Sequence, residues 1–175
     1  MPRPLLALLL LSACSMDEYT IEEGKHSSTS RVSLVSGTSM VFDAAFDASA
    51  IYETVDPSNQ ADINKLMGFS DCSSHHHSNS ARFGWRWYDD ELQIHAYTYA
   101  DGTRSYALLG SVDIDSVEPY RIEIDADRYV FTFDGATTEM DRGCSGDSLA
   151  KYQLYPYFGG DETAPHDITI LINEQ

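Results

Sequence analysis

Alternating apolar and polar residues recur along most of this chain and constrain its fold more than any other feature of the sequence. Between Leu92 and Tyr97 apolar side chains occupy every second position, and the same period returns at Ile122, across 129–133 and across 168–172. Successive side chains of a β-strand point to opposite faces, so a period of two predicts strands with one buried face. We therefore expect a chain built mainly from strands.

Short turn signals separate the predicted strands: Asp101-Gly102, Asp125-Ala126-Asp127, Asp134-Gly135 and Gly159-Gly160. Short strands at this spacing, without helical patterns between them, predict an all-β fold, an antiparallel β-sandwich of the jelly-roll or concanavalin-like type. A short helix over 60–67 is one interpretation of that segment, because Ile63, Leu66 and Met67 would share a helical face. A strand ending at Gly68 fits the same residues.

The first fourteen residues have the pattern of an export signal. Arg3 precedes an apolar run from Leu5 to Leu11 that is too short to span a bilayer as a helix. The tetrad Leu11-Ser12-Ala13-Cys14 resembles the lipobox of bacterial lipoproteins. The resemblance implies cleavage before Cys14, lipid on this cysteine, and a location in the cell envelope at the outer membrane or cell surface. An ordinary signal peptide with an incidental cysteine is the alternative.

We expect three segments: a signal peptide over 1–13, a flexible tether over 14–31 and a single β-sandwich domain over 32–175. The tether prediction rests on the polar composition up to Arg31, rich in serine and threonine, which offers little apolar surface to bury. The remaining length suits one domain with its own hydrophobic core.

The charge balance restricts the partners. The chain carries 28 acidic against 11 basic residues, a formal net charge of −17. Phosphate backbones are bound mainly by lysine and arginine, so nucleic acid is excluded as a partner, and anionic membrane surfaces and polyanionic sugars are disfavoured. Solubility outside the cell is the general explanation of such acidity.

Cys72 and Cys144 are the two cysteines that remain if Cys14 carries lipid. In an exported protein a cysteine pair is more often oxidised than free, which predicts a disulfide. The bridge requires Cα atoms within about 7 Å of each other, and without that geometry both residues would be buried thiols.

A polar segment before residue 80 holds the candidate metal ligands Asp71, His75, His76 and His77. Imidazole binds divalent metals, and a divalent metal is the only cofactor that the sequence suggests. Neighbours in an extended chain point to opposite faces, so we expect at most His75 and His77 to converge, with donors such as His166 and Asp167 completing the site. A polar loop beside the disulfide is the alternative.

Aromatic residues supply the candidate ligand contacts. Phe83, Trp85 and Trp87 alternate with Arg82, Gly84 and Arg86. Phe83 and Trp85 are expected in the core, whereas Trp87, nearer the strand end, is expected to be exposed and to stack on a sugar ring. The segment 152–164 predicts a shaped loop in which Tyr155 and Tyr157 line a concave face, with an aromatic corner as the alternative. The predicted ligand-binding set is Arg82, Trp87, Tyr155 and Tyr157.

Two resemblances to known families follow from these residues. The segments 64–71, 79–86 and 156–160 resemble those of uncharacterised secreted bacterial β-sandwich domains of the concanavalin-like or jelly-roll type, which bring no established activity. The tripeptide Gln93-Ile94-His95 resembles one in the sites of alginate-lyase-type jelly rolls. There glutamine neutralises a uronate carboxylate, histidine or tyrosine removes the C5 proton, and tyrosine protonates the leaving oxygen. The resemblance implies the catalytic candidates Gln93, His95, Arg82 and Tyr157, although the family's arginine-rich strand is absent.

We therefore expect a lipid-anchored extracytoplasmic domain that binds a glycan or a cell-surface partner rather than transforming it. The fold supports binding and catalysis equally. A polysaccharide-acting enzyme is the first alternative, and it requires the four catalytic candidates to converge in one cleft. A structural envelope lipoprotein without a small ligand is the second.

Overall fold

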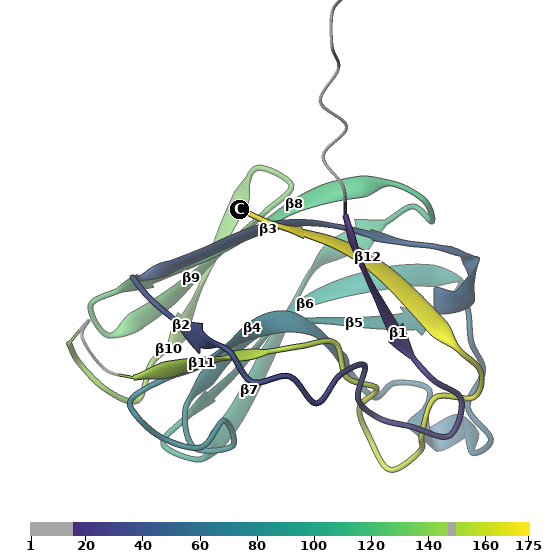
Figure 1. Cartoon of the computed structure of the whole chain (residues 1–175), viewed down its shortest axis with the longest axis horizontal. Coiled ribbons are helices and arrows are strands. Elements are labelled where there is room, and N and C mark those ends of the chain that lie inside the picture. Colours follow the sequence, from purple (N-terminus) through teal and green to yellow (C-terminus); the bar gives the residue numbers. More distant parts are fainter. Residues whose placement is uncertain (1–15, 147–149) are drawn as a thin grey trace, which may run out of the picture.

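The computed structural model describes residues 16–146 and 150–175, which form two antiparallel six-stranded sheets facing one another (Figure 1). The back sheet has the strand order β1-β12-β3-β8-β9-β10 and the front sheet β2-β11-β4-β5-β6-β7. The back-sheet strands are β1 (Asp17–Ile21), β12 (Ile168–Glu174), β3 (Ser39–Phe46), β8 (Val117–Asp125), β9 (Arg128–Phe133) and β10 (Ala136–Asp141). The front-sheet strands are β2 (Leu34–Val35), β11 (Lys151–Leu154), β4 (Asn64–Ser70), β5 (Ser80–Tyr88), β6 (Glu91–Ala100) and β7 (Thr103–Val112).

Helical structure within the described residues is limited to two short 3₁₀ turns, η1 (Ala48–Ala50) and η2 (Pro57–Asn59). Neither turn approaches the length and apolarity that a membrane-crossing helix needs, and the same holds throughout the described residues. The prediction of an antiparallel β-sandwich is confirmed.

The core lies between the sheets and is rich in aromatic side chains. Phe83 of β5 meets Phe42 of β3 and Phe131 of β9 edge-on, with ring centroids 6.0 and 5.1 Å apart. Trp85 is fully buried and packs on Phe46 at 5.2 Å. Aromatic pairs in this geometry add to the free energy gained from burying their area. The prediction that Phe83 and Trp85 belong to the core is confirmed.

The Asp-Gly turns set the register of two hairpins. Asp101-Gly102 joins β6 to β7, and Asp134-Gly135 joins β9 to β10. All four residues have positive φ angles between 46° and 78°. Two consecutive left-handed residues are typical of the type I′ turn, whose twist matches that of the flanking strands. The turn predictions at both positions are confirmed.

The predicted tether over 14–31 is wrong from Asp17 onward. Residues 17–21 form β1, which pairs with β12 at the edge of the back sheet, and they bury Tyr19 and Ile21. Two buried side chains suffice there because the strand adds to an existing sheet edge. The sandwich therefore begins at β1 rather than at residue 32. The predicted signal peptide and Cys14 lie outside the described residues.

The stretch with competing helix and strand patterns is a strand. β4 begins at Asn64 and continues beyond Gly68 to Ser70. A register shift in its pairing with β5, between Lys65 and Gly68, accompanies the complete burial of both Leu66 and Met67. A bulge breaks strict alternation, which explains why a helical spacing fitted these residues in the sequence.

Candidate functional site

A cleft of about 520 Å³ opens on the face of the front sheet that points away from the core. Its lining residues are Lys65, His75, His76, His77, Arg82, Tyr97, Arg104, Tyr157, Gly159 and Gly160. A smaller hollow of about 100 Å³ continues it, sharing Lys65, Tyr97 and Arg104 and adding residues that include Asp62 and Tyr106. We call the two together the basic cleft, because none of the described residues that line its larger part is acidic.

Strand pairing brings the cleft residues into one row. Arg82 of β5 lies opposite Tyr97 of β6, and Tyr97 lies opposite Tyr106 of β7. Arg82 alternates with the core residue Phe83, so its side chain points to the outer face. Gly68 of β4 lies on its other side, where an added Cβ would come within 2.7 Å of the Arg82 Cγ atom. The absence of a side chain at Gly68 makes the room that Arg82 occupies.

Within the described part of the chain, Arg82 is a buried cation without a matching anion. The residue is 6 % exposed, and its Nε atom has no hydrogen-bond partner among the described residues. Burial lowers the pKa of Arg82 to about 10, with neighbouring tyrosines, Tyr97 first, opposing that shift. A buried guanidinium normally pairs with a carboxylate, because its desolvation is costly. The structure therefore presents to the cleft a guanidinium whose Nε atom lacks a hydrogen-bond acceptor.

Lys65 contributes a second basic side chain to the cleft, and its surroundings disfavour the charged form of its amine. Burial, followed by the charges of Arg82 and Arg104, lowers the pKa of Lys65 to about 7. Its Nζ atom lies 4.5 Å from the centre of the Tyr97 ring and donates to the carbonyl of Ile63. Within residues 16–146 and 150–175, neither Lys65, Arg82 nor Arg104 forms an ion pair. An anionic ligand would complement all three groups.

Gln93 and His95 do not line this cleft. Arg86 donates through Nε to the Gln93 Oε1 atom at 2.8 Å and through Nη1 to the carbonyl of Ala61 at 2.6 Å, so the segment before β4 lies over this end of the sheet. His95 is 1 % exposed. The structure thus places Arg82 and Tyr157 in the lining of the basic cleft, whereas Gln93 and His95 are buried beside it, with the His95 ring 6.4 Å from that of Tyr106. The four catalytic candidates therefore do not all line one cleft.

The aromatic residues that were predicted to contact a ligand do not all lie in the basic cleft. Trp87 is half-buried against the core and lines a separate pocket of about 310 Å³ with Tyr52, Tyr88 and other residues. The expectation that Tyr155 lines a concave face is wrong, since it is 8 % exposed and belongs to the core. Its hydroxyl donates to the Ser33 Oγ atom at 2.8 Å. Tyr157 is 38 % exposed and available to a ligand.

All three consecutive histidines lie together on the loop between β4 and β5. One ring nitrogen of each histidine lies within 4.8 Å of those of the other two, so the three could hold a metal ion. The expectation that only His75 and His77 could converge is wrong, because the loop is a series of turns rather than an extended strand. The distant donors are engaged elsewhere: His166 bonds the carbonyl of Ser49, and Asp167 accepts from the backbone amide of Glu23.

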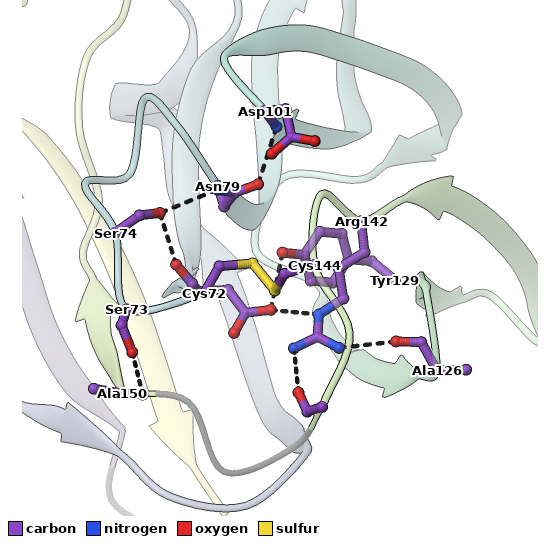
Figure 2. Close-up of polar contacts among 12 residues, drawn as sticks. Cys72, Ser73, Ser74, Asn79, Asp101, Ala126, Tyr129, Arg142, Cys144 and Ala150 are labelled. Atoms are coloured by element: carbon purple, nitrogen blue, oxygen red, sulfur yellow. Dashed lines mark hydrogen bonds and ion pairs between the residues drawn. A yellow bond between two sulfur atoms is a disulfide. The ribbon is translucent and has the colours of Figure 1, made fainter.

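The base of this histidine loop is fastened by the disulfide, as Figure 2 shows. The Cα atoms of Cys72 and Cys144 are 5.9 Å apart, which confirms the predicted bridge. Beside it, Asp71 accepts from the Nε atom of Arg142 at 2.6 Å and from the hydroxyl of Tyr129 at 3.0 Å. The side chains of Asp71 and Arg142 are both fully buried. Asp71 is therefore a structural anchor and not a partner of the histidines.

Sequence reasoning missed Lys65, Tyr97 and Arg104. The signal that could have found Arg104 is the two-residue turn at Asp101-Gly102, which dictates that Arg104 lies opposite Tyr99. The corresponding turn at Asp89-Asp90 places Arg82 opposite Tyr97. Lys65 could not be found in this way, because its position depends on the irregular pairing of β4.

Acid is expected to destabilise the domain through His95. Burial, then the charge of Arg86, lowers the pKa of His95 from its usual 6.5 to about 4. Between those pH values the unfolded chain binds a proton that the folded chain does not, so stability is complete above about pH 6.5 and is lost as the pH falls toward 4. The loss due to His95 is about 2 kcal/mol near pH 4.5.

Urea unfolding near pH 7 and near pH 4.5 measures this effect. His95→Gln should show a smaller difference between the two conditions than the parent chain, whatever its stability at neutral pH. Equal differences in the two proteins would contradict the assignment to His95.

Comparisons with known proteins describe the fold. No protein-family model and no curated protein sequence matches the chain. Among solved structures it is similar to the alginate lyase vAL-1 from Chlorella virus, at 11 % identity and a TM-score of 0.57, over 91 % of this chain and 82 % of that one. It is also similar to the alginate lyase AlyC3, at 10 % identity and a TM-score of 0.61, over 90 % and 72 % of the two chains.

A third similar structure is a Bacteroides ovatus mixed linkage glucan GH16 protein in complex with a product. Identity is 7 %, the TM-score is 0.58, and 91 % of this chain and 79 % of that one are covered. At such low identities a likeness establishes architecture alone. The chain accordingly has the jelly-roll, concanavalin-like sandwich fold of these proteins.

Proposed function

We propose that this domain binds an acidic saccharide, with uronate carboxylates held in the basic cleft. The observation that carries the proposal is Arg82, a buried guanidinium that faces the cleft and has no carboxylate partner among the residues that the structure describes. Arginine and carboxylate form charge-assisted hydrogen bonds, often two in parallel, which would satisfy this group. Lys65 and Arg104 would neutralise further carboxylates along the chain of sugars.

Two further features support a sugar over another anion. Tyr157 and Tyr106 are 38 % and 56 % exposed at the cleft, and aromatic rings of this kind stack on the C–H faces of pyranose rings. In addition, two of the structurally similar proteins are named as alginate lyases, and alginate is a polyuronate. The net charge of the whole chain disfavours a polyanion at long range, but the local charge of the cleft acts on a bound carboxylate at contact distance.

A uronate lyase is the second candidate function, favoured by the lowered pKa of Lys65. An amine with a pKa of about 7 is partly neutral at physiological pH and can accept a proton. β-Elimination would also need Arg82 to neutralise the uronate carboxylate and Tyr157 to donate a proton to the leaving oxygen. The ultraviolet absorbance of an unsaturated product, followed with oligouronates, separates a lyase from a binding domain.

Calorimetric titration tests the binding proposal. Oligouronates should bind and neutral gluco-oligosaccharides of equal length should bind far more weakly. Arg82→Met should weaken oligouronate binding by about 10- to 100-fold, because a hydrogen-bonded ion pair is lost. Arg121→Met is the matched control, since Arg121 is an exposed arginine on the back sheet paired with Glu123. Equal binding by the parent and Arg82→Met would refute the proposal.

We also infer that the domain is carried in the cell envelope by lipid on Cys14. The inference rests on the lipobox resemblance of Leu11-Ser12-Ala13-Cys14 and on an export-type disulfide. Cells that express the full chain and are fed an alkyne-tagged fatty acid should label it, and Cys14→Ser should abolish the label. Persistent labelling of Cys14→Ser would contradict lipid attachment at this residue.

A further inference from the structure

We propose that His75, His76 and His77 together bind one divalent transition-metal ion at the rim of the basic cleft. Their ring centroids are 4.1 Å (His75 to His76), 4.4 Å (His76 to His77) and 5.1 Å (His75 to His77) apart. The ring nitrogens lie within 4.8 Å of one another. Two imidazole nitrogens on one tetrahedral zinc ion are about 3.3 Å apart, so small side-chain rotations would complete the geometry.

The loop that carries the histidines is held in place before any ion binds. Near its start, Cys72 and Ser73 adopt left-handed backbone conformations with φ of 58° and 51°. The disulfide fixes Cys72, and Ser73 exchanges hydrogen bonds with Ala150 (Figure 2). At the other end of the loop, Asn79 donates to Ser74 and accepts from the amide of Asp101. Backbone strain that the surroundings enforce is a feature of functional loops.

Hydrogen bonds within the loop set the orientation of each ring. The backbone amide of His76 donates to the hydroxyl of Tyr152 at 3.0 Å, and the Nδ1 atom of His76 lies at the same distance from that hydroxyl. The Nδ1 atom of His75 accepts from the amide of His77 at 3.3 Å. These contacts occupy Nδ1, which assigns Nε2 of both rings to the metal. Metal-binding histidines are commonly oriented in this way by a hydrogen bond to the other ring nitrogen.

The chemistry of the donors selects the kind of ion. Three imidazoles suit Zn²⁺, Cu²⁺ or Ni²⁺ rather than Ca²⁺ or Mg²⁺, which prefer oxygen ligands. Three protein ligands leave a coordination position open toward the cleft.

A carboxylate of the saccharide would fit the open coordination position of the ion. Arg82 and Lys65 line the same cleft as the three histidines, and their positive charges oppose a bare cation there. A uronate carboxylate that bridges the ion and Arg82 would offset this repulsion. The metal and the acidic saccharide should therefore strengthen each other's binding. This coupling rests on the proposed function, whereas the metal site itself does not.

The test is a titration of the full chain, produced without a polyhistidine tag, with zinc chloride in the absence of saccharide. One equivalent should bind, and Co²⁺ in its place should give visible absorption bands of a site with nitrogen ligands. His75→Gln and His77→Gln replace exposed side chains and should each weaken zinc binding at least tenfold. His166→Gln, a histidine outside the loop, should bind zinc as the parent does. No zinc binding, or binding unchanged in both loop variants, overturns the metal site.

A second titration separates the two proposals. With zinc bound, the affinity for oligouronates should rise, and an equal affinity with and without zinc would overturn the coupling while the metal site stands. If zinc binds but oligouronates bind under neither condition, the acidic-saccharide proposal fails and the metal site is retained.

Discussion

Replacing Asp71 with alanine is expected to lower the free energy of unfolding by about 3–5 kcal/mol, because it leaves a buried arginine without its counter-charge. The Arg142 guanidinium is fully buried, and among the described residues it would keep its hydrogen bonds to the carbonyls of Ala126 and Gly146, each at 2.8 Å. Burial and the Asp71 charge also raise the pKa of Tyr129, which holds its hydroxyl protonated as a donor to Asp71. The substitution would leave that donor without its acceptor.

Urea unfolding of two further variants isolates the cause. Asp141→Ala removes the partner of Arg128 in an exposed ion pair and should cost less than about 1 kcal/mol. Asp71→Ala combined with Arg142→Met removes both buried charges, and this double variant should regain a large part of the loss. A double variant no more stable than Asp71→Ala alone would show that the unpaired charge is not what destabilises the domain.

Removing the disulfide by replacing Cys72 and Cys144 with serine is expected to lower the free energy of unfolding by about 2–5 kcal/mol. The bridge joins residues 72 positions apart, so its loss releases a long loop in the unfolded chain. It also releases one end of the loop that carries His75, His76 and His77. The double-serine variant should therefore bind zinc more weakly than the parent chain, even at temperatures where it remains folded.

A reductant provides the control for this prediction. Thermal unfolding of the parent under reducing conditions should approach that of the double-serine variant, whereas the variant itself should be insensitive to the reductant. A reductant effect of equal size in both proteins would contradict a role for this bridge in stability.

The sequence predicted those parts of the fold that depend on local pattern. Alternation placed Phe83 and Trp85 in the core, and the Asp-Gly turns placed the hairpins, because both effects act within a few residues. The same patterns failed at β1, whose five residues gain their order from pairing with β12 at the far end of the chain. No local feature of residues 17–21 indicates that they pair with β12.

The candidate site was predictable only in part, for a related reason. Arg82 and Tyr157 were among the predicted residues, but the charge argument used the sum over the whole chain and so disfavoured an acidic ligand. The cleft gathers Lys65, Arg82 and Arg104 from three different strands, and net charge contains no information on such clustering. Gln93 is likewise tied to a segment distant in the sequence, because Arg86 bonds both its Oε1 atom and the carbonyl of Ala61.

The position of β1 has a consequence for how the domain would sit on a membrane. Cys14 precedes the first residue of this strand by three positions, a reach of about 10 Å at most. A lipid on Cys14, as proposed above, would therefore hold the edge of the back sheet near the headgroups and bring the exposed residues Asp17 and Glu18 close to them. The cleft belongs to the other sheet. A domain held in this way would stay close to the membrane. It would therefore bind only saccharide that lies within one domain's width of the bilayer.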